Sequence, residues 1–387
     1  MVLSWDLVDL DLSLAFLRPL LGPRLVSFNL GLDLESGDHK ELSSFLKTLP
    51  YHCPGLKAVS LGIFLDINDA ESISPVLSRT ICCFDKLDRL AIHTQIDDVT
   101  LRHLIVSSQY TQLLLTIRQH QIEELELSLL PSDIPFSGAK MIGLSGLELG
   151  SMIGLLRSEG QRFTITEFHL AVPPTSQLTL SFLTALASST RRSSLQSLTL
   201  DRRYSNIAES QLEDIHYILS RDTLQPLVFF HNLRELSIDL KNPMSLNDQE
   251  LVDLARAWPL LRFLRIISGS ATSTHHLTLR ALLMLVVACP KLESVGLCVD
   301  AVQVPKRRAD RGIRSVILKE LDFPGSPIDD AELVAKFLLR HFPSADCVLG
   351  PRWNRGEEYA EDWLEVHEYL KEKDKIKHPR RRVEPTS

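Results

Sequence analysis

One apolar pattern recurs along almost the whole chain, and this repetition restricts the fold more than any single motif does. The pattern is L-x-x-L-x-L, with other large apolar side chains replacing leucine at some positions, and successive copies begin 26 to 43 residues apart. The ten copies begin at Leu25, Leu56, Leu87, Ile122, Ile165, Leu195, Leu233, Leu261, Leu292 and Leu318. A unit of this length cannot bury its apolar face alone, so neighbouring units must stack against one another.

A second column of residues supports this alignment. Three positions before a copy stands a large or sulfur-bearing residue at Cys53, Phe84, Phe230, Trp258 and Cys289. Proline follows this residue at Cys53, Trp258 and Cys289. Because the column is independent of the apolar triplets, its recurrence argues against a chance match.

Each unit predicts a strand, a turn and a helix. The last L-x-L reads as a short strand with alternate residues buried, and helical patterns lie between the copies. Helix starts are expected at Asn247 with Glu250 and at Asp329 with Glu332, where a capping residue precedes a glutamate by three positions. The helical patterns cover about 40–49, 98–119, 178–188, 208–220, 277–288 and 330–340.

These units predict an α/β fold, a leucine-rich-repeat solenoid. Its curved parallel sheet would line the concave face and its helices the convex face, over about ten repeats in residues 1–350 with a partial first one. The segment Val2–Trp5 reads as the latter half of that first strand. A doubly wound nucleotide-binding sheet would require a GxGxxG turn, which the sequence lacks.

Composition and charge exclude several classes. Hydrophobic residues are 44% of the chain and charged ones 24%, which is typical of a folded protein. The formal net charge of −7 gives no strong field for nucleic acid or membranes, so neither is an expected partner. The most apolar stretch, 141–156, is too short to span a bilayer and contains Glu148. Without a basic segment before an apolar run at the start, a cytoplasmic or nuclear location is expected.

Catalytic and metal-binding patterns are not found in the sequence. The segment 143–147 lacks the glycine spacing of a nucleophile elbow, and neither HExxH nor a phosphate-binding GxxxxGK[ST] occurs. The six cysteines form no CxxC pair, so we expect buried free thiols in a reducing compartment. No catalytic residue, metal or cofactor is therefore expected. The alternative is a hydrolase or transferase site assembled on the concave face from distant repeats.

Strand residues between the buried ones are expected to point to the concave face and to bind a protein partner. That surface carries six acids and two arginines. A groove that steers a basic partner segment is one interpretation, and an ordinary solvated sheet face is the interpretation that we favour. Phe263 is its exposed aromatic residue, and aromatic residues often anchor interfaces. The candidates are Glu124, Glu126, Glu167, His169, Glu235, Phe263, Arg265 and Glu320.

The C-terminal part holds a predicted helix and a basic tail. Tyr359, Trp363, Val366 and Leu370 form an apolar stripe over about 357–373. Within the segment 351–375, this helix is expected to cap the last repeat, and a partner-binding helix is the alternative. Basic clusters at 306–314 and 377–382 are nuclear-localisation or phosphate-binding candidates. The plainer interpretation is solvated loops, with a disordered tail over 376–387.

Three segments carry a family resemblance: 16–25 (FLRPLLGPRL), 257–261 (AWPLL) and 326–343, which contains SPID, VA and FP. They resemble segments of fungal (basidiomycete) F-box proteins with leucine-rich repeats, over about residues 3–370. The resemblance implies the substrate-recognition part of a ubiquitin-ligase subunit, in which an F-box binds the adaptor subunit of the ligase.

The sequence departs from this family in two ways. No F-box precedes the repeats, so we expect a truncated product or a protein that binds without recruiting a ligase; a purely structural fragment is a further alternative. The ninth position of the early repeats holds Asp33, Phe64, Gln95, Leu130, Pro173 or Arg203 and never asparagine. The turns must therefore be satisfied by other groups.

Overall fold

The computed structural model describes residues 1–7, 14, 17–33, 39–64, 67–94, 96–117, 121, 136–156, 163–170, 172–190, 192–202, 215–240, 242–267, 277–305, 312–347 and 359–377. The chain forms two compact units. The first comprises Met1–Val172 and Ser188–Leu195, and the second comprises Pro173–Ala187 and Gln196–Ser387.

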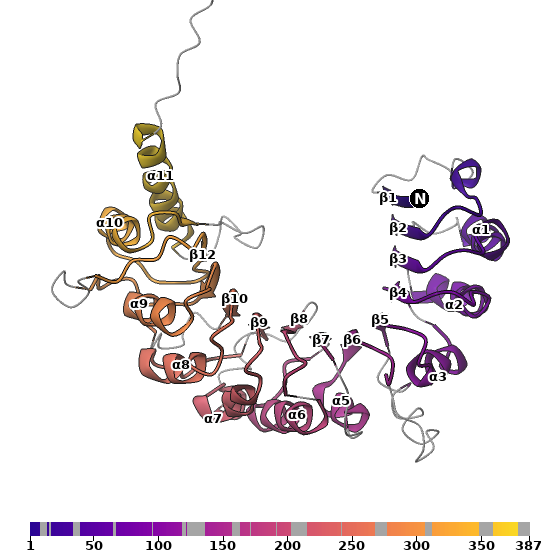
Figure 1. Ribbon diagram of the computed structural model, residues 1–387, viewed down its shortest axis with the longest axis horizontal. Helices are drawn as coiled ribbons and strands as arrows, with labels where there is room; N and C mark the ends of the chain where they lie inside the picture. Colours follow the sequence, from indigo (N-terminus) through magenta and orange to yellow (C-terminus); the bar gives the residue numbers. More distant parts are fainter. Residues whose placement is uncertain are drawn as a thin grey trace, which may run out of the picture. The chain divides into compact units, whose positions relative to one another are not determined.

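The first unit is a parallel sheet with helices on one face (Figure 1). Its strands pair in sequence order from β1 to β7. The strands are β1 (Val2–Leu7), β2 (Ser27–Asp33), β3 (Ala58–Phe64), β4 (Arg89–Ile92), β5 (Gln112–Thr116), β6 (Met141–Leu147) and β7 (Ile165–Leu170). The helices are η2 (Arg18–Leu20), α1 (His39–His52), α2 (Ile67–Cys82), α3 (Asp98–Val106) and α5 (Leu149–Leu155).

The second unit repeats the same plan (Figure 1). Parallel strands again pair in sequence order from β8 to β13. They are β8 (Ser197–Arg202), β9 (Glu235–Asp239), β10 (Phe263–Ile266), β11 (Ser294–Leu297), β12 (Glu320–Asp322) and β13 (Asp346–Cys347). The helices are α6 (Ser176–Ser189), most of which belongs to this unit, η4 (Ile215–Tyr217), α7 (Arg221–Leu224), η5 (Gln225–Phe229), α8 (Asp248–Ala255), α9 (Leu279–Ala288), α10 (Ala331–His341) and α11 (Ala360–Lys377).

This succession of parallel strands and returning helices is an α/β leucine-rich-repeat solenoid, so the predicted fold class is confirmed. The first leucines of the repeats form the core in both units, and Leu25, Leu56, Leu195, Leu233, Leu261 and Leu318 are fully buried. Since side chains alternate along a strand, the positions between the buried ones face away from the helices.

The second column of the sequence forms the turn that enters each strand. Its members are buried. At Cys53, Phe230, Trp258 and Cys289 the backbone carbonyl accepts a hydrogen bond from the N–H of the first residue of the triplet, at 3.1 to 3.2 Å. The indole Nε1 of Trp258 also donates to the carbonyl of Leu227 at 3.0 Å. The column therefore packs and hydrogen-bonds one repeat onto the preceding one.

Two repeats of the first unit begin at residues that the apolar pattern did not predict. β4 pairs with β5 and β5 with β6, so the repeats after β4 begin at Tyr110 and Ala139. Both residues are buried, at 1% and 4% exposure, but neither is a leucine or a similar branched apolar residue. The copy predicted at Ile122 lies outside the described residues.

The strand register also moves the next predicted copy by two residues. Met141 lies opposite Ile165, so the buried triplet in register is Phe163, Thr166 and Phe168 rather than the one that begins at Ile165. The apolar pattern does not detect this copy, because the buried residue Thr166 occupies a position that leucine usually holds. A shift of two keeps every side chain on its face, so the surface assignments for β7 hold.

Helix ends differ from the expected ones at several places. The capping box at Asn247 and Glu250 is confirmed, with both reciprocal hydrogen bonds at 3.0 Å. The cap of α10 is Asp330, one residue after the predicted Asp329. Helix α3 ends at Val106 instead of continuing to 119, because β5 follows at once. Of the helix predicted over 208–220, the described part is the 3-10 turn η4 and the residues after it.

The backbone groups in the turns after the strands are hydrogen-bonded without an asparagine at the ninth position of the repeats. Asn242 is buried one residue after the ninth position of its repeat, and it donates to the carbonyls of Pro174 and Tyr217 at 2.9 and 2.8 Å. Ser326 occupies the ninth position of its repeat, and its hydroxyl accepts from the backbone N–H of Val299 at 2.9 Å. Different polar side chains therefore replace asparagine in different repeats.

The second unit ends in α11, which packs on α10 and β13. Trp363, Val366 and Leu370 are buried, whereas Tyr359 precedes the helix at a positive φ of 67° and is not part of its stripe. The indole Nε1 of Trp363 donates to the carbonyl of Ser326 at 2.8 Å. The basic segments at 306–311 and 378–387 lie outside the described residues.

Candidate protein-binding face of the second unit

The structure divides the predicted binding residues between the two units. Glu235, Phe263, Arg265 and Glu320 lie on β9, β10 and β12 of the second unit, on the face away from the helices. The first unit holds two more on β7, Glu167 and His169. Glu124 and Glu126 lie outside the described residues. The part that forms a continuous surface is therefore the face of the second unit.

A single row of side chains crosses this face. The register places Glu235 beside Phe263, Phe263 beside Ser294, and Ser294 beside Glu320. Ser197 of β8 extends the row, and its hydroxyl donates to Glu235 Oε2 at 3.0 Å. The half-exposed Phe263 ring thus lies between two glutamates that come from strands on either side of it.

A shallow depression of about 230 Å³ lies over this row. The row residues and three charged neighbours line it: Glu235, Phe263, Ser294 and Glu320, with Arg262, Glu293 and Lys319. Arg262 and Glu293 are paired through two hydrogen bonds, at 2.9 and 3.0 Å. That pair is internally neutral, so the remaining lining charges are two carboxylates and one ammonium.

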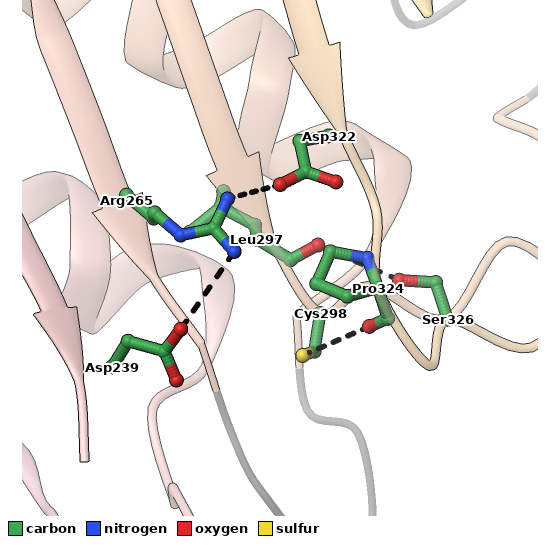
Figure 2. A network of polar contacts seen from close by, with 7 residues as sticks. All are labelled: Asp239, Arg265, Leu297, Cys298, Asp322, Pro324 and Ser326. Carbon is green, nitrogen blue, oxygen red and sulfur yellow. Dashed lines mark hydrogen bonds and ion pairs between the residues drawn. The ribbon is translucent and has the colours of Figure 1, made fainter. Parts of the chain in front are cut away.

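Below the row, Arg265 is held by two aspartates (Figure 2). Its guanidinium donates to Asp322 of β12 and forms an ion pair with Asp239 at the end of β9, at 3.7 Å. Asp239 is only 2% exposed. We call these three residues the arginine clamp.

Gly296 allows the arginine clamp to form. It lies opposite Arg265 on one side and Asp322 on the other, so the arginine side chain must cross it. A Cβ atom at Gly296 would approach Arg265 Cγ to 3.1 Å and Nη1 to 3.3 Å, which is tighter than ordinary contact. The missing side chain therefore lets one guanidinium reach across a strand.

The strands of the second unit give their open face an acidic character. From β8 to β12, the charged side chains on this face are Asp201, Glu235, Asp239, Glu320, Asp322 and one cation, Arg265. Two of these acids, Asp201 and Asp239, lie opposite each other on β8 and β9. We call this surface the acidic face.

Sequence reasoning missed Asp201 and Asp239. Both come after the last apolar residue of their triplet, where the pattern was taken to end. The signal was present, because both continue the alternation of Ser197 and Thr199 or of Glu235 and Ser237. Extending that alternation by one step would have found them.

Five of the six cysteines are described as free, and not all of these five are buried. Cys53, Cys289 and Cys298 are buried, whereas Cys82 and Cys83 are exposed, which corrects the expectation of buried thiols throughout. Burial raises the pKa of Cys289 to about 12, and its thiol donates to the carbonyl of Ala255 at 3.4 Å. Burial raises the pKa of Cys53 as well.

In the part of the chain that the structure describes, no three His, Cys, Asp or Glu side chains form a group that could hold a metal ion. No described helix combines the length and the apolar character needed to cross a bilayer.

Comparisons with known proteins give structural similarity only. No protein-family model matches the chain, and no curated protein matches it. A chain of the yeast Rad7 and Elc1 complex is similar in structure, with a TM-score of 0.49 and 12% identity over 89% of this chain and 81% of that one. The leucine-rich repeat-containing protein LegL7 from Legionella pneumophila matches with a TM-score of 0.34 and 12% identity over 96% and 98%. The fold assignment rests on the strand order and the repeated units.

Proposed function

We propose that this chain is a non-enzymatic protein-interaction scaffold whose acidic face binds a basic segment of another protein. The observation that carries the proposal is the charge of the described strands β8 to β12. Five carboxylates and a single guanidinium share one sheet face, and Asp239 and Asp322 already hold that guanidinium. Such a surface steers a basic partner toward it and disfavours acidic ones.

The form of the acidic face suits a protein partner. Parallel strands about 4.8 Å apart hold the side chains of the row in fixed order, so the surface needs little rearrangement on binding. Phe263 supplies an aromatic residue near the middle of the row, and aromatic residues often carry much of the binding energy of an interface. The depression above it is shallow and open, which suits an extended segment.

A finer assignment follows from the family resemblance in the sequence. The segments around Pro19, Trp258 and Ser326 support a role as the substrate-recognition part of a fungal F-box ubiquitin-ligase subunit that acts in the cytoplasm or nucleus. Ser326 and Trp258 are both fully buried, so these segments carry the architecture of the repeats. Recruitment of the ligase adaptor would require an F-box in the same polypeptide.

Affinity purification with quantitative mass spectrometry tests the binding proposal. The wild type is compared with Glu235→Lys/Glu320→Lys, and Asp222→Lys on helix α7 of the same unit provides the same type of charge reversal outside the acidic face as a control. We expect partners cross-linked through basic segments to be lost in the double variant and retained in the control. Unchanged partners in the folded double variant would refute the acidic face as the binding surface. Presence of the ligase adaptor among the partners would separately support the finer assignment.

A further inference from the structure

The acidic face contains two pairs of carboxylates on β9 and β12. Glu235 and Glu320 lie in one row, whereas Asp239 lies two residues beyond the row of Arg265 and Asp322, so the second pair is diagonal. In the lower pair, Asp239 of β9 and Asp322 of β12 hold the guanidinium of Arg265 between them (Figure 2). In the upper pair, Glu235 of β9 and Glu320 of β12 lie at the two ends of the row. The lower pair shows that one guanidinium can bridge these strands.

The upper pair differs in the residue that β10 provides. Phe263 takes the place above Arg265 on the same face of β10, so an aromatic ring lies where the lower pair has its cation. Of the two cations that line the depression, Arg262 is paired with Glu293, and Lys319 is adjacent to Glu320 in sequence. The two ends of the row therefore lack a bridging cation from β10 or β11.

We propose that this row accepts one arginine side chain from the basic segment of the partner protein, with its guanidinium between Glu235 and Glu320 and its plane on Phe263. This inference rests on the proposed function and specifies how the acidic face selects its partner. The arginine would repeat, from outside the chain, the bridge that Arg265 makes in the arginine clamp.

The geometry favours arginine over lysine. Three strand spacings of about 4.8 Å place the backbones of Glu235 and Glu320 about 14 Å apart. Glu235 Oε2 accepts a hydrogen bond from Ser197 of β8 at 3.0 Å, so a bound guanidinium would use the other carboxylate oxygen or replace that hydrogen bond. A guanidinium is planar and donates from opposite edges, so it can bind both carboxylates at once, whereas the ammonium of lysine is a compact point charge. The planar cation also stacks on an aromatic ring.

The test uses the full chain and two fluorescein-labelled peptides of identical length, Gly-Arg-Gly-Arg-Gly-Arg-Gly and its lysine counterpart. Binding is measured by fluorescence anisotropy at low ionic strength, where exposed charges are little screened. We expect the arginine peptide to bind about tenfold more tightly than the lysine peptide, which corresponds to about 1.4 kcal/mol.

Three variants test whether the row causes this preference. Glu235→Gln and Glu320→Gln should each reduce the ratio of the two affinities toward one, and Phe263→Leu should reduce it while keeping the charge. Asp222→Asn, on helix α7 of the same unit, removes one negative charge from an exposed position outside the acidic face and should change neither affinity. Thermal unfolding curves of all variants confirm that each is folded.

The possible results separate this inference from the proposed function. If both peptides bind equally and both weaken in Glu235→Gln and Glu320→Gln, the acidic face binds basic segments without selecting arginine, and this inference is overturned. A preference that persists in all three row variants would also overturn it, because the selection would then lie elsewhere. If the wild type binds neither peptide, both proposals fail.

Discussion

The two units share one backbone plan but present different open faces. On strands β2 to β6 of the first unit, the described side chains of this face are mostly small or uncharged, and Arg89 is the charged residue among them. On β8 to β12 of the second unit, the corresponding positions carry the five carboxylates of the acidic face and Arg265. The same buried leucines thus support two surfaces with different chemistry.

This difference shows which positions of a repeat determine the fold and which are available for binding. The buried positions determine that the repeats stack, and nearly all of them hold apolar residues in both halves of the chain. The alternate positions of each strand are free of that packing requirement, so they can specialise for binding. A functional surface can therefore be confined to a few repeats without any change in architecture.

The largest expected effect concerns the arginine clamp. Arg265→Ala removes the cation between Asp239 and Asp322, of which Asp239 is almost completely buried. Removing one partner of a buried ion pair costs about 3–5 kcal/mol, so the free energy of local unfolding of β9 to β12 should fall by that order. Hydrogen–deuterium exchange of the peptides that cover these strands measures it.

The matched change in the first unit is Arg89→Ala. Arg89 is exposed on the open face of β4, so its loss should change stability by no more than about 0.5 kcal/mol. Equal exchange rates in the wild type and Arg265→Ala would show that the clamp does not stabilise the second unit. The acidic face would then have to be regarded as an ordinary solvated surface.

A smaller effect of opposite sign in the two units is expected for two glycines. Gly296→Ala places a Cβ atom 3.1 Å from Arg265 Cγ and should destabilise β10 to β12 by about 1–2 kcal/mol through overpacking and displacement of the arginine. At Gly62 of β3 the nearest atoms to such a Cβ are 3.9 Å away. Gly62→Ala should therefore stabilise the first unit by about 0.5–1 kcal/mol, because alanine has fewer unfolded conformations.

Hydrogen–deuterium exchange again separates the two units in one experiment. Destabilisation of both variants by the same amount would mean that the glycines have the same role, which would contradict the assignment of Gly296 to the clamp. Gly296→Ala should also leave the first unit unchanged, and this provides the internal control.

Much of this fold could be predicted from the sequence, because it depends on a repeated burial pattern. The prediction failed where a buried position held Tyr110, Ala139 or Thr166, since burial in a stack depends on neighbours and not on leucine itself. The candidate site could be predicted only as a face. Strand periodicity placed Glu235, Phe263 and Glu320 on it, but their sharing of one row depends on the register between strands.

The arginine clamp was beyond sequence reasoning for a different reason. It requires an arginine on β10 to cross Gly296 and meet carboxylates on β9 and β12, and the carboxylate on β12 is 57 positions from the arginine in the chain. No spacing rule connects them. The strand order and the missing side chain at Gly296 bring them together, and both are properties of the folded sheet.

The smallest effect compares equivalent buried thiols of the two units across pH. Burial raises the pKa of Cys289 well above its ordinary value, to about 12, and burial also raises the pKa of Cys53. The unfolded chain releases the Cys289 proton above pH 9 while the folded chain keeps it. The stability that this thiol contributes is therefore complete below pH 9 and decreases as the pH rises toward 12.

Urea unfolding of the wild type and Cys289→Ala from pH 8 to pH 10.5 measures this contribution. The difference in unfolding free energy between the two should shrink as the pH rises, by less than about 1.4 kcal/mol per pH unit, because a single proton is involved. Cys53→Ala in the first unit should show the same direction, because burial also raises the pKa of Cys53. A difference that stays constant, or that grows with pH, would show that the Cys289 thiol is accessible to solvent. The turn that contains Cys289 would then not exclude water from the second unit.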